Sequence, residues 1–280
     1  MSEETSSPLQ RILVALNASP HSRAALDAAV HLAEIFEATL KGVFIEDERL
    51  LQAAQLPFAE EVRAYTTSPK RLTDRRVQRQ LRYQAEYAEH TLQYAAEQAE
   101  VDYDFETVQG HVTRELLQAA PEVDLLVLGK TSTASSRRRL GSTSQTILSD
   151  APSSVLVLRE TVPPQPPILT YYDGTAAATA TLRLAAELAR RGNPQPLTVL
   201  LPPGTESETR RLREALQTQY AALDFSLHVH PLTPAESARL SAFARRTDGI
   251  VILPDECAPL AHTPLKQFLY ELDRPLLLMR

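Results

Sequence analysis

Residues 10–34 read QRILVALNASPHSRAALDAAVHLAE, and residues 166–190 read PPILTYYDGTAAATATLRLAAELAR. The two stretches align without a gap, and each contains a short apolar run, a small polar turn and a helical pattern rich in alanine and leucine. An apolar strand followed directly by a helix is typical of the βαβ units that build parallel sheets. The pair of stretches therefore predicts an α/β fold that is present twice in the chain.

Two further matches follow in the same order. VDLLVLGK at 123–130 corresponds to TDGIVILP at 247–254, and APSSVLVLR at 151–159 corresponds to DRPLLLMR at 273–280. Ordered matches of this kind indicate an internal duplication. The predicted strands are residues 11–17, 40–46, 103–109, 124–129 and 154–159 in the first copy, and 167–172, 197–201, 225–230, 249–253 and 275–279 in the second. Because short apolar strands alternate with helical patterns, we expect each copy to form a parallel sheet covered on both faces.

The sequence also indicates where two helices begin and where the two copies are joined. Ser19, which precedes Pro20, and Thr175 in the second copy are predicted to cap the first helix of each copy. The proline-rich segment 163–167 cannot continue a helix or a central strand, so it predicts a stiff linker. We therefore expect a first domain at 1–162 and a second domain at 168–280.

The copies differ mainly between their second and third strands. The first copy carries an extra helical segment near 50–99, in which residues 72–99 have the spacing of an amphipathic helix. The apolar positions of this pattern are Leu81, Ala85, Ala88, Leu92 and Ala95. Six lysine or arginine side chains lie at 70–82, where we interpret them as a solvated helix face, the alternative being contact with an acidic partner.

Composition excludes several classes of protein. No apolar run of the 280-residue chain approaches the roughly 18 residues of a membrane-spanning helix, so we expect no membrane partner. The net charge of −6 argues against nucleic-acid binding. The acidic N-terminus lacks the pattern of an export signal, and the single Cys257 allows no internal disulfide, so both features favour the cytoplasm. In the second copy, Cys257 is also a candidate redox-sensitive thiol.

The unit that begins ILVALNAS at 12–19, and ends in a glycine-serine loop, a helix and a terminal strand, resembles the universal stress protein family. The duplicated chain resembles the tandem form of that family. The resemblance implies two doubly wound, Rossmann-like, five-stranded parallel sheets with strand order 3-2-1-4-5. It also implies that the two last strands, SSVLVLR and PLLLMR, pair about a pseudo-twofold axis.

Nucleotide-binding members of the family carry a G-x2-G-x9-G-(S/T) loop after the fourth strand. Backbone amides at the glycines and at the start of the next helix point toward the phosphates. In this chain the matching stretch is LGKTSTASSRRRLGSTSQTIL at 128–148. Gly129 matches the first glycine and Gly141 with Ser142 the last pair, while Ser132 stands at the second glycine and Thr143 adds a hydroxyl.

The resemblance assigns three further positions around the nucleotide. Ile45 falls where a residue of the second strand packs on adenine, and Ala15 flanks the base. Asn17 stands where the family has an aspartate near the ribose or a metal ion. The implied ligand is ATP or AMP, held by Ala15, Asn17, Ile45, Gly129, Ser132, Gly141, Ser142 and Thr143.

The second copy lacks the glycines of this loop. Its corresponding segment is PDECAPLAHTPLKQ at 254–267, so we expect no nucleotide there. His228 and His230 have a metal-compatible spacing but no third ligand in the sequence, so no metal site is expected. No nucleophile, base and acid form a recognisable set, so we expect no enzyme. The family resemblance implies a stress-response regulatory or protective protein. The alternative is a ligand-free scaffold whose helix at 72–99 recruits a protein partner. A homodimer is a further assembly that we consider, with no surface assigned to it.

Overall fold

The computed structural model describes residues 8–17, 20–56, 60–61, 70–71, 73–129, 141–158, 167–191, 196–220, 225–245, 249–258, 260, 267–268, 271–272 and 274–280. The linker predicted at 163–167 lies almost entirely outside these ranges, so the domain boundary stays a prediction. We refer to residues 8–158 as the N-terminal half and to residues 167–280 as the C-terminal half.

All ten predicted strands are present, each within two residues of its expected bounds. The N-terminal half contains β1 (Arg11–Leu16), α1 (Pro20–Phe36), β2 (Thr39–Asp47), α2 (Glu48–Gln55), β3 (Glu60–Glu61), β4 (Lys70–Arg71), α3 (Asp74–Gln98), β5 (Tyr103–Gly110), α4 (Val112–Ala119), the 3-10 turn η1 (Ala120–Glu122), β6 (Leu125–Gly129), α5 (Ser142–Asp150) and β7 (Ser154–Leu158). The C-terminal half contains β8 (Ile168–Tyr171), α6 (Ala176–Arg190), β9 (Leu197–Leu201), α7 (Glu206–Tyr220), β10 (Leu227–Pro231), α8 (Pro234–Ser237), α9 (Leu240–Ala244), β11 (Ile250–Pro254) and β12 (Leu276–Met279).

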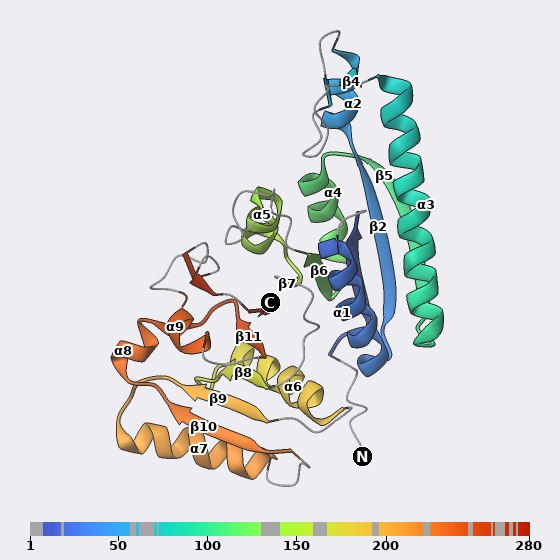
Figure 1. Ribbon diagram of the computed structural model, residues 1–280. Helices are drawn as coiled ribbons and strands as arrows, with labels where there is room; N and C mark the ends of the chain where they lie inside the picture. The colour runs from blue at the N-terminus through green and yellow to red at the C-terminus, as the bar shows by residue number, and fades with distance from the viewer. Residues whose placement is uncertain are drawn as a thin grey trace.

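Ten strands form one continuous sheet in the order β10-β9-β8-β11-β12-β7-β6-β1-β2-β5. Each half therefore has the strand order 3-2-1-4-5, which confirms the topology that the resemblance implied. The junction between the halves is the antiparallel pair of β12 and β7, in which Leu277 lies opposite Leu156. In Figure 1 the blue-green N-terminal half and the yellow-red C-terminal half meet at this pair. The pairing covers two apolar edges that would otherwise be exposed.

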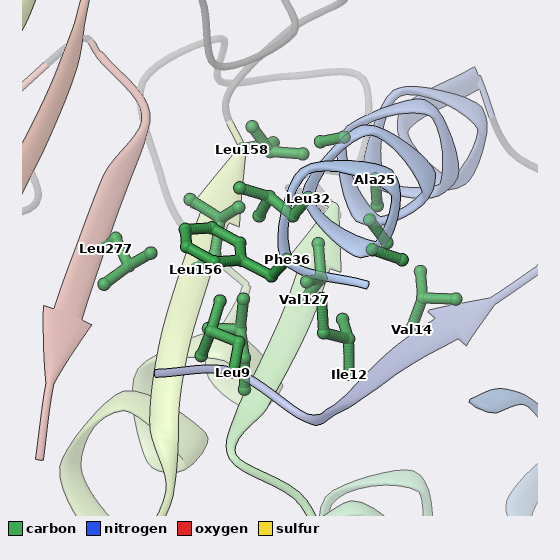
Figure 2. Close-up of a cluster of buried hydrophobic side chains, with 14 of the residues drawn as sticks. Leu9, Ile12, Val14, Ala25, Leu32, Phe36, Val127, Leu156, Leu158 and Leu277 are labelled. Carbon is green, nitrogen blue, oxygen red and sulfur yellow. The ribbon is translucent and has the colours of Figure 1, made fainter. Parts of the chain in front are cut away.

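The core crosses this junction. Strands β6, β7 and β11 are buried along almost their whole length, as expected for parallel strands covered on both faces. Figure 2 shows the ring of Phe36, at the end of α1, lying beside Leu156 of β7, with Leu9 and Leu277 close to them. One buried cluster thus includes side chains from both halves, so the halves stabilise each other by burying shared apolar surface.

The last residue, Arg280, also joins the halves. Its guanidinium donates to Asp255 Oδ2 at 2.9 Å in the C-terminal half and to the carbonyl oxygens of Leu148 and Ala151 in the N-terminal half. These carbonyls lie at the end of α5, where a cation satisfies free acceptors and the negative end of the helix dipole. Arg280 therefore supports the helix whose other end faces the site described below.

The extra segment of the N-terminal half comprises α2, the β3–β4 hairpin and a long α3. The helix predicted at 72–99 is confirmed, and its buried face consists of Val77, Leu81, Ala85, Ala88, Leu92 and Ala96. The equivalent helix α7 has 15 residues, whereas α3 has 25. In Figure 1, α3 runs along the outer flank of the N-terminal half. In the part of the chain that the structure describes, no helix is long and apolar enough to cross a membrane.

Candidate functional site

A pocket of about 290 Å³ lies at the carboxyl ends of β1, β2 and β6. This is the point where the strand order reverses direction from β1, the usual binding position in open α/β sheets. Its volume is at the lower end of the range for small-molecule sites. Its polar lining residues are Asn17, Ser22, Asp47, Gln84, Thr143 and Ser144, and the rest of the lining is apolar except for the backbone at Gly129.

Five of the eight residues assigned from the sequence line this pocket. They are Ala15, Asn17, Ile45, Gly129 and Thr143, contributed by β1 and the turn after it, β2, β6 and α5. The fold therefore brings together positions that are more than 100 residues apart. Two more, Gly141 and Ser142, begin α5 beside Thr143 but do not line the pocket. The eighth, Ser132, and the arginines at 137–139 lie outside the described residues.

Gly129 has a packing reason to be glycine. A Cβ atom at this position would lie 2.3 Å from the backbone carbonyl oxygen of His21, in the first turn of α1. Real Cβ atoms do not approach a backbone oxygen so closely, so β6 and α1 meet here only because the side chain is absent. The sequence assigned Gly129 to phosphate binding, and the structure adds this close approach of strand and helix as an independent requirement.

The first turn of α5 suits an anion. Gly141 is the N-cap residue, and among the described residues no side chain accepts a hydrogen bond at the cap. The backbone amides of this turn lie at the end of the helix where the dipole concentrates positive potential. Thr143, in this turn, lines the pocket, and its hydroxyl accepts a hydrogen bond from Thr113 Oγ1 at 3.4 Å. The arrangement suits a negatively charged group at the mouth of the pocket.

Several lining residues were missed by the sequence analysis. The hydroxyl of the buried Ser22 accepts a hydrogen bond of 2.9 Å from the backbone N–H of Asn17. This bond holds the turn after β1 against α1. Asp47 Oδ1 accepts the Arg49 amide at 3.0 Å and so caps α2. Leu50 of α2, with Leu81 and Gln84 of α3, forms another part of the wall. The sequence did indicate an added segment, but its place over the pocket depends on how the chain folds back.

The C-terminal half is different at the equivalent position. Alignment of the two copies puts Tyr171 at the position of Ala15 and Leu253 at that of Gly129. Both side chains are fully buried in a cluster that also contains Phe268 and Leu272. At the carboxyl ends of β8 and β11, buried side chains thus fill the position that corresponds to the pocket at the ends of β1 and β6. The expectation that the second copy has no nucleotide site stays a prediction.

The first turn of α6 is also closed by its own side chains. Thr175 Oγ1 accepts the Ala178 amide at 3.1 Å, which confirms the predicted cap. Asp173 Oδ1 accepts the amide of Thr175 at 3.0 Å, and Gly174 between them has a φ of +86°, a left-handed conformation that favours glycine. Asp173 is the counterpart of Asn17 in the second copy, and its carboxylate therefore serves to shape a turn.

Burial also suppresses the chemistry of Cys257. Its side chain is 3% exposed, and desolvation raises the pKa of the thiol to about 12. Because the thiolate is the reactive form, the thiol is inert at neutral pH. The structure therefore gives no support to the redox interpretation of this cysteine.

Tyr171→Phe is expected to stabilise the protein by about 1 kcal/mol, because the buried hydroxyl has no hydrogen-bond partner among the described residues. Burial, reinforced by Asp173, raises the pKa of Tyr171 above its ordinary 10.0. Unfolding therefore releases this proton above pH 10.0, so stability is unaffected below that pH and falls as pH rises beyond it. Urea unfolding at neutral and at alkaline pH should show a smaller alkaline loss in the variant. Tyr172→Phe is the control, and a less stable Tyr171→Phe variant would contradict the interpretation.

Comparison with known proteins agrees with this architecture. The model of the universal stress protein family matches residues 8–159, which is more than half of the chain. A universal stress protein from Archaeoglobus fulgidus DSM 4304 superposes with a TM-score of 0.69 at 14% identity, over 98% of each chain. A putative universal stress protein from Pseudomonas aeruginosa UCBPP-PA14 has a TM-score of 0.61 at 14% identity, over 97% of this chain and 93% of that one.

The same overall fold extends beyond that family. The cytoplasmic domain of a prokaryotic cation chloride cotransporter has a TM-score of 0.50 at 10% identity, over 96% of this chain and 94% of that one. Identities this low show the fold alone. No curated protein matches the chain. The family match over β1 to β7, together with the repeated 3-2-1-4-5 sheet, establishes that the chain belongs to the universal stress protein family and has its tandem form.

Proposed function

We propose that the pocket of the N-terminal half binds an adenine nucleotide, ATP or AMP, and that the protein is a regulatory or protective binding protein. The observation that carries the proposal is one continuous arrangement of an apolar pocket and a helix start. Ile45 and the neighbouring apolar walls suit a planar base, whereas Thr143 and the amides of α5 suit a phosphate. Asn17, in the turn after β1, also lines the pocket and suits a ribose hydroxyl.

The scarcity of carboxylates around the pocket favours nucleotide binding without a metal ion held by the protein. Asp47 is the one carboxylate among the described lining residues, and it caps α2. Asn17 replaces the family aspartate and brings no negative charge for a divalent cation. Within the described ranges, no group of three or more His, Cys, Asp or Glu residues is placed to hold a metal ion. We therefore expect nucleotide affinity to change little when magnesium is removed.

The lining also favours binding over catalysis. Among the described lining residues there is no histidine, cysteine or lysine, and the one carboxylate, Asp47, caps α2, so no described side chain is assigned as a base for the hydroxyls of the pocket. A nucleophile that is not activated in this way remains weak. We propose that the bound nucleotide acts as a signal or stabilising ligand and is not turned over.

Calorimetric titration of the full chain with ATP and with AMP tests this function. We expect saturable one-to-one binding of at least one of them, with and without magnesium, because buried Tyr171 and Leu253 fill the position of the C-terminal half that corresponds to the pocket. The chain has no tryptophan and 9 tyrosines, so a nucleotide that copurifies should raise the absorbance at 260 nm visibly. A protein-like spectrum together with no heat of binding for either nucleotide would reject the proposal.

A ligand-free scaffold is the second candidate function. It is favoured by the exposed tyrosines of α3, which lie away from the pocket wall. The same titration distinguishes the two functions, because a scaffold would bind its partner without any nucleotide.

A further inference from the structure

The solvent-facing side of α3 carries unusually large aromatic side chains. Tyr83, Tyr87 and Tyr94 are 69%, 53% and 64% exposed, and they are three of the six large hydrophobic residues exposed in the described part of the chain. All three lie on the side of the helix opposite the buried Leu81 and Leu92. Tyrosine is enriched at protein interfaces, where its ring is buried and its hydroxyl keeps a polar contact.

The residues along this side have the spacing of a helix-packing seam. We define the α3 outer face by Arg79, Tyr83, Glu86, His90, Tyr94 and Glu97. Successive members are three or four residues apart, so they form one stripe along the helix. Figure 1 shows α3 on the outer flank, with no other element of the chain drawn beyond it. The stripe is therefore accessible to another molecule.

Charge along α3 is segregated in the direction that a lone helix disfavours. Its first half carries Arg75, Arg76, Arg79 and Arg82, and no lysine or arginine follows until Arg114. The second half carries Glu86, Glu89 and Glu97. The last turn contains no basic residue. Asp74 in the first turn suits the helix dipole, but Arg75 and Arg76 beside it and the lack of a basic residue in the last turn oppose it, so the isolated helix is weakened. An antiparallel helix with the same charges would reverse the effect.

We propose that the α3 outer face binds α3 of a second copy of the chain, packed antiparallel about a twofold axis at the level of Ala88. Two residues whose numbers average 88 then lie opposite each other across the axis. Arg79 therefore faces Glu97 of the second copy, and Glu86 faces His90 of the second copy. Each contact occurs twice, as a self-complementary twofold interface requires. The tyrosines flank these pairs and supply the apolar area.

In the N-terminal half, the topology leaves α3 as the more suitable surface for self-association. The edges of β7 and β12, through which the two halves pair, are already used inside one chain. At the outer end of the N-terminal half, the edge strand β5 carries the acidic Asp104 and Glu106, which oppose pairing with an identical edge. The α3 outer face, in contrast, is complementary to itself.

Sedimentation equilibrium of the full chain tests the interface through a charge exchange. We expect a concentration-dependent dimer at micromolar protein. Arg79→Glu or Glu97→Arg alone should weaken association roughly tenfold or more, because two attractive pairs become repulsive. The double variant Arg79→Glu with Glu97→Arg restores opposite charges in the antiparallel register, so its dimer constant should return close to that of the original chain.

Arg213→Glu on the exposed side of α7 is the matched control, because it makes the same charge change on the equivalent helix of the other half. It should leave the dimer constant unchanged. Arg79 and Glu97 are exposed, so all variants should keep the original circular dichroism spectrum and melting temperature. A chain that stays monomeric at high micromolar concentration would overturn the proposal. A dimer that is insensitive to Arg79→Glu, or one that the double variant fails to restore, would overturn it as well.

Discussion

Leu277→Asp is expected to destabilise the whole protein by more than about 4 kcal/mol. Leu277 is fully buried and lies opposite Leu156 in the one antiparallel step of the ten-stranded sheet. An aspartate there would place an unpaired carboxylate in the cluster that both halves share, where it must either lose its charge or separate the halves. In Figure 2, Leu277 lies near Leu156 and Phe36 of the other half, which belong to the same buried cluster.

Thermal and urea unfolding of the full chain measure this effect. Leu277→Met is the matched control, because it keeps most of the volume and should cost less than about 1.5 kcal/mol. We expect the aspartate variant to lose stability in both halves together, since the cluster is continuous. If the N-terminal half kept its original unfolding midpoint, the junction of β7 and β12 would not be the stabilising contact inferred here.

Ala15→Tyr is expected to reduce nucleotide affinity by about 100-fold or more, the loss that filling the pocket should produce. The substitution copies the C-terminal half, where Tyr171 occupies the equivalent position and is completely buried. Ala15 lines the pocket beside Ile45 and Gly129, so a phenol ring at residue 15 would take the space proposed for the base.

Calorimetry with ATP and AMP measures the loss, and the unfolding midpoint checks that the variant still folds. Ala15→Ser is the control at the same position, because its small side chain leaves the pocket open and binding should persist. A folded Ala15→Tyr protein that binds nucleotide as tightly as the original chain would place the ligand elsewhere.

The fold was largely predictable because its signals are local. Short apolar runs and helical periodicity located all ten strands of the large sheet and the long helix α3, but not the short β3–β4 hairpin. The cap at Thr175 follows from its position before an alanine-rich helix. The repeat then showed that one topology occurs twice. The residues of α2 could not be placed in the same way, since their role depends on contacts with segments far along the chain.

The candidate site was predictable only in part. The family motif led to Gly129 and Thr143, and the strand positions led to Ala15 and Ile45, which all line the pocket. Leu81 and Gln84 could not be inferred, because the pattern of α3 shows which side is buried but not what that side covers. The binding role of the assigned residues, including Ser132 outside the described ranges, remains a prediction for the titrations above.

The sequence alone was sufficient for the duplication and for most element types, because both depend on repeated or periodic patterns within short segments. The family came from the resemblance of the first strand and the glycine-serine loop. Tertiary structure decided where those segments meet. It joined the halves through Leu156 and Leu277, opened a pocket beside Ala15 and closed its counterpart with Tyr171. Side-chain volume matters only once distant strands and helices are packed together, so the repeated fold has a pocket beside Ala15 in one half and the buried Tyr171 at the equivalent position of the other.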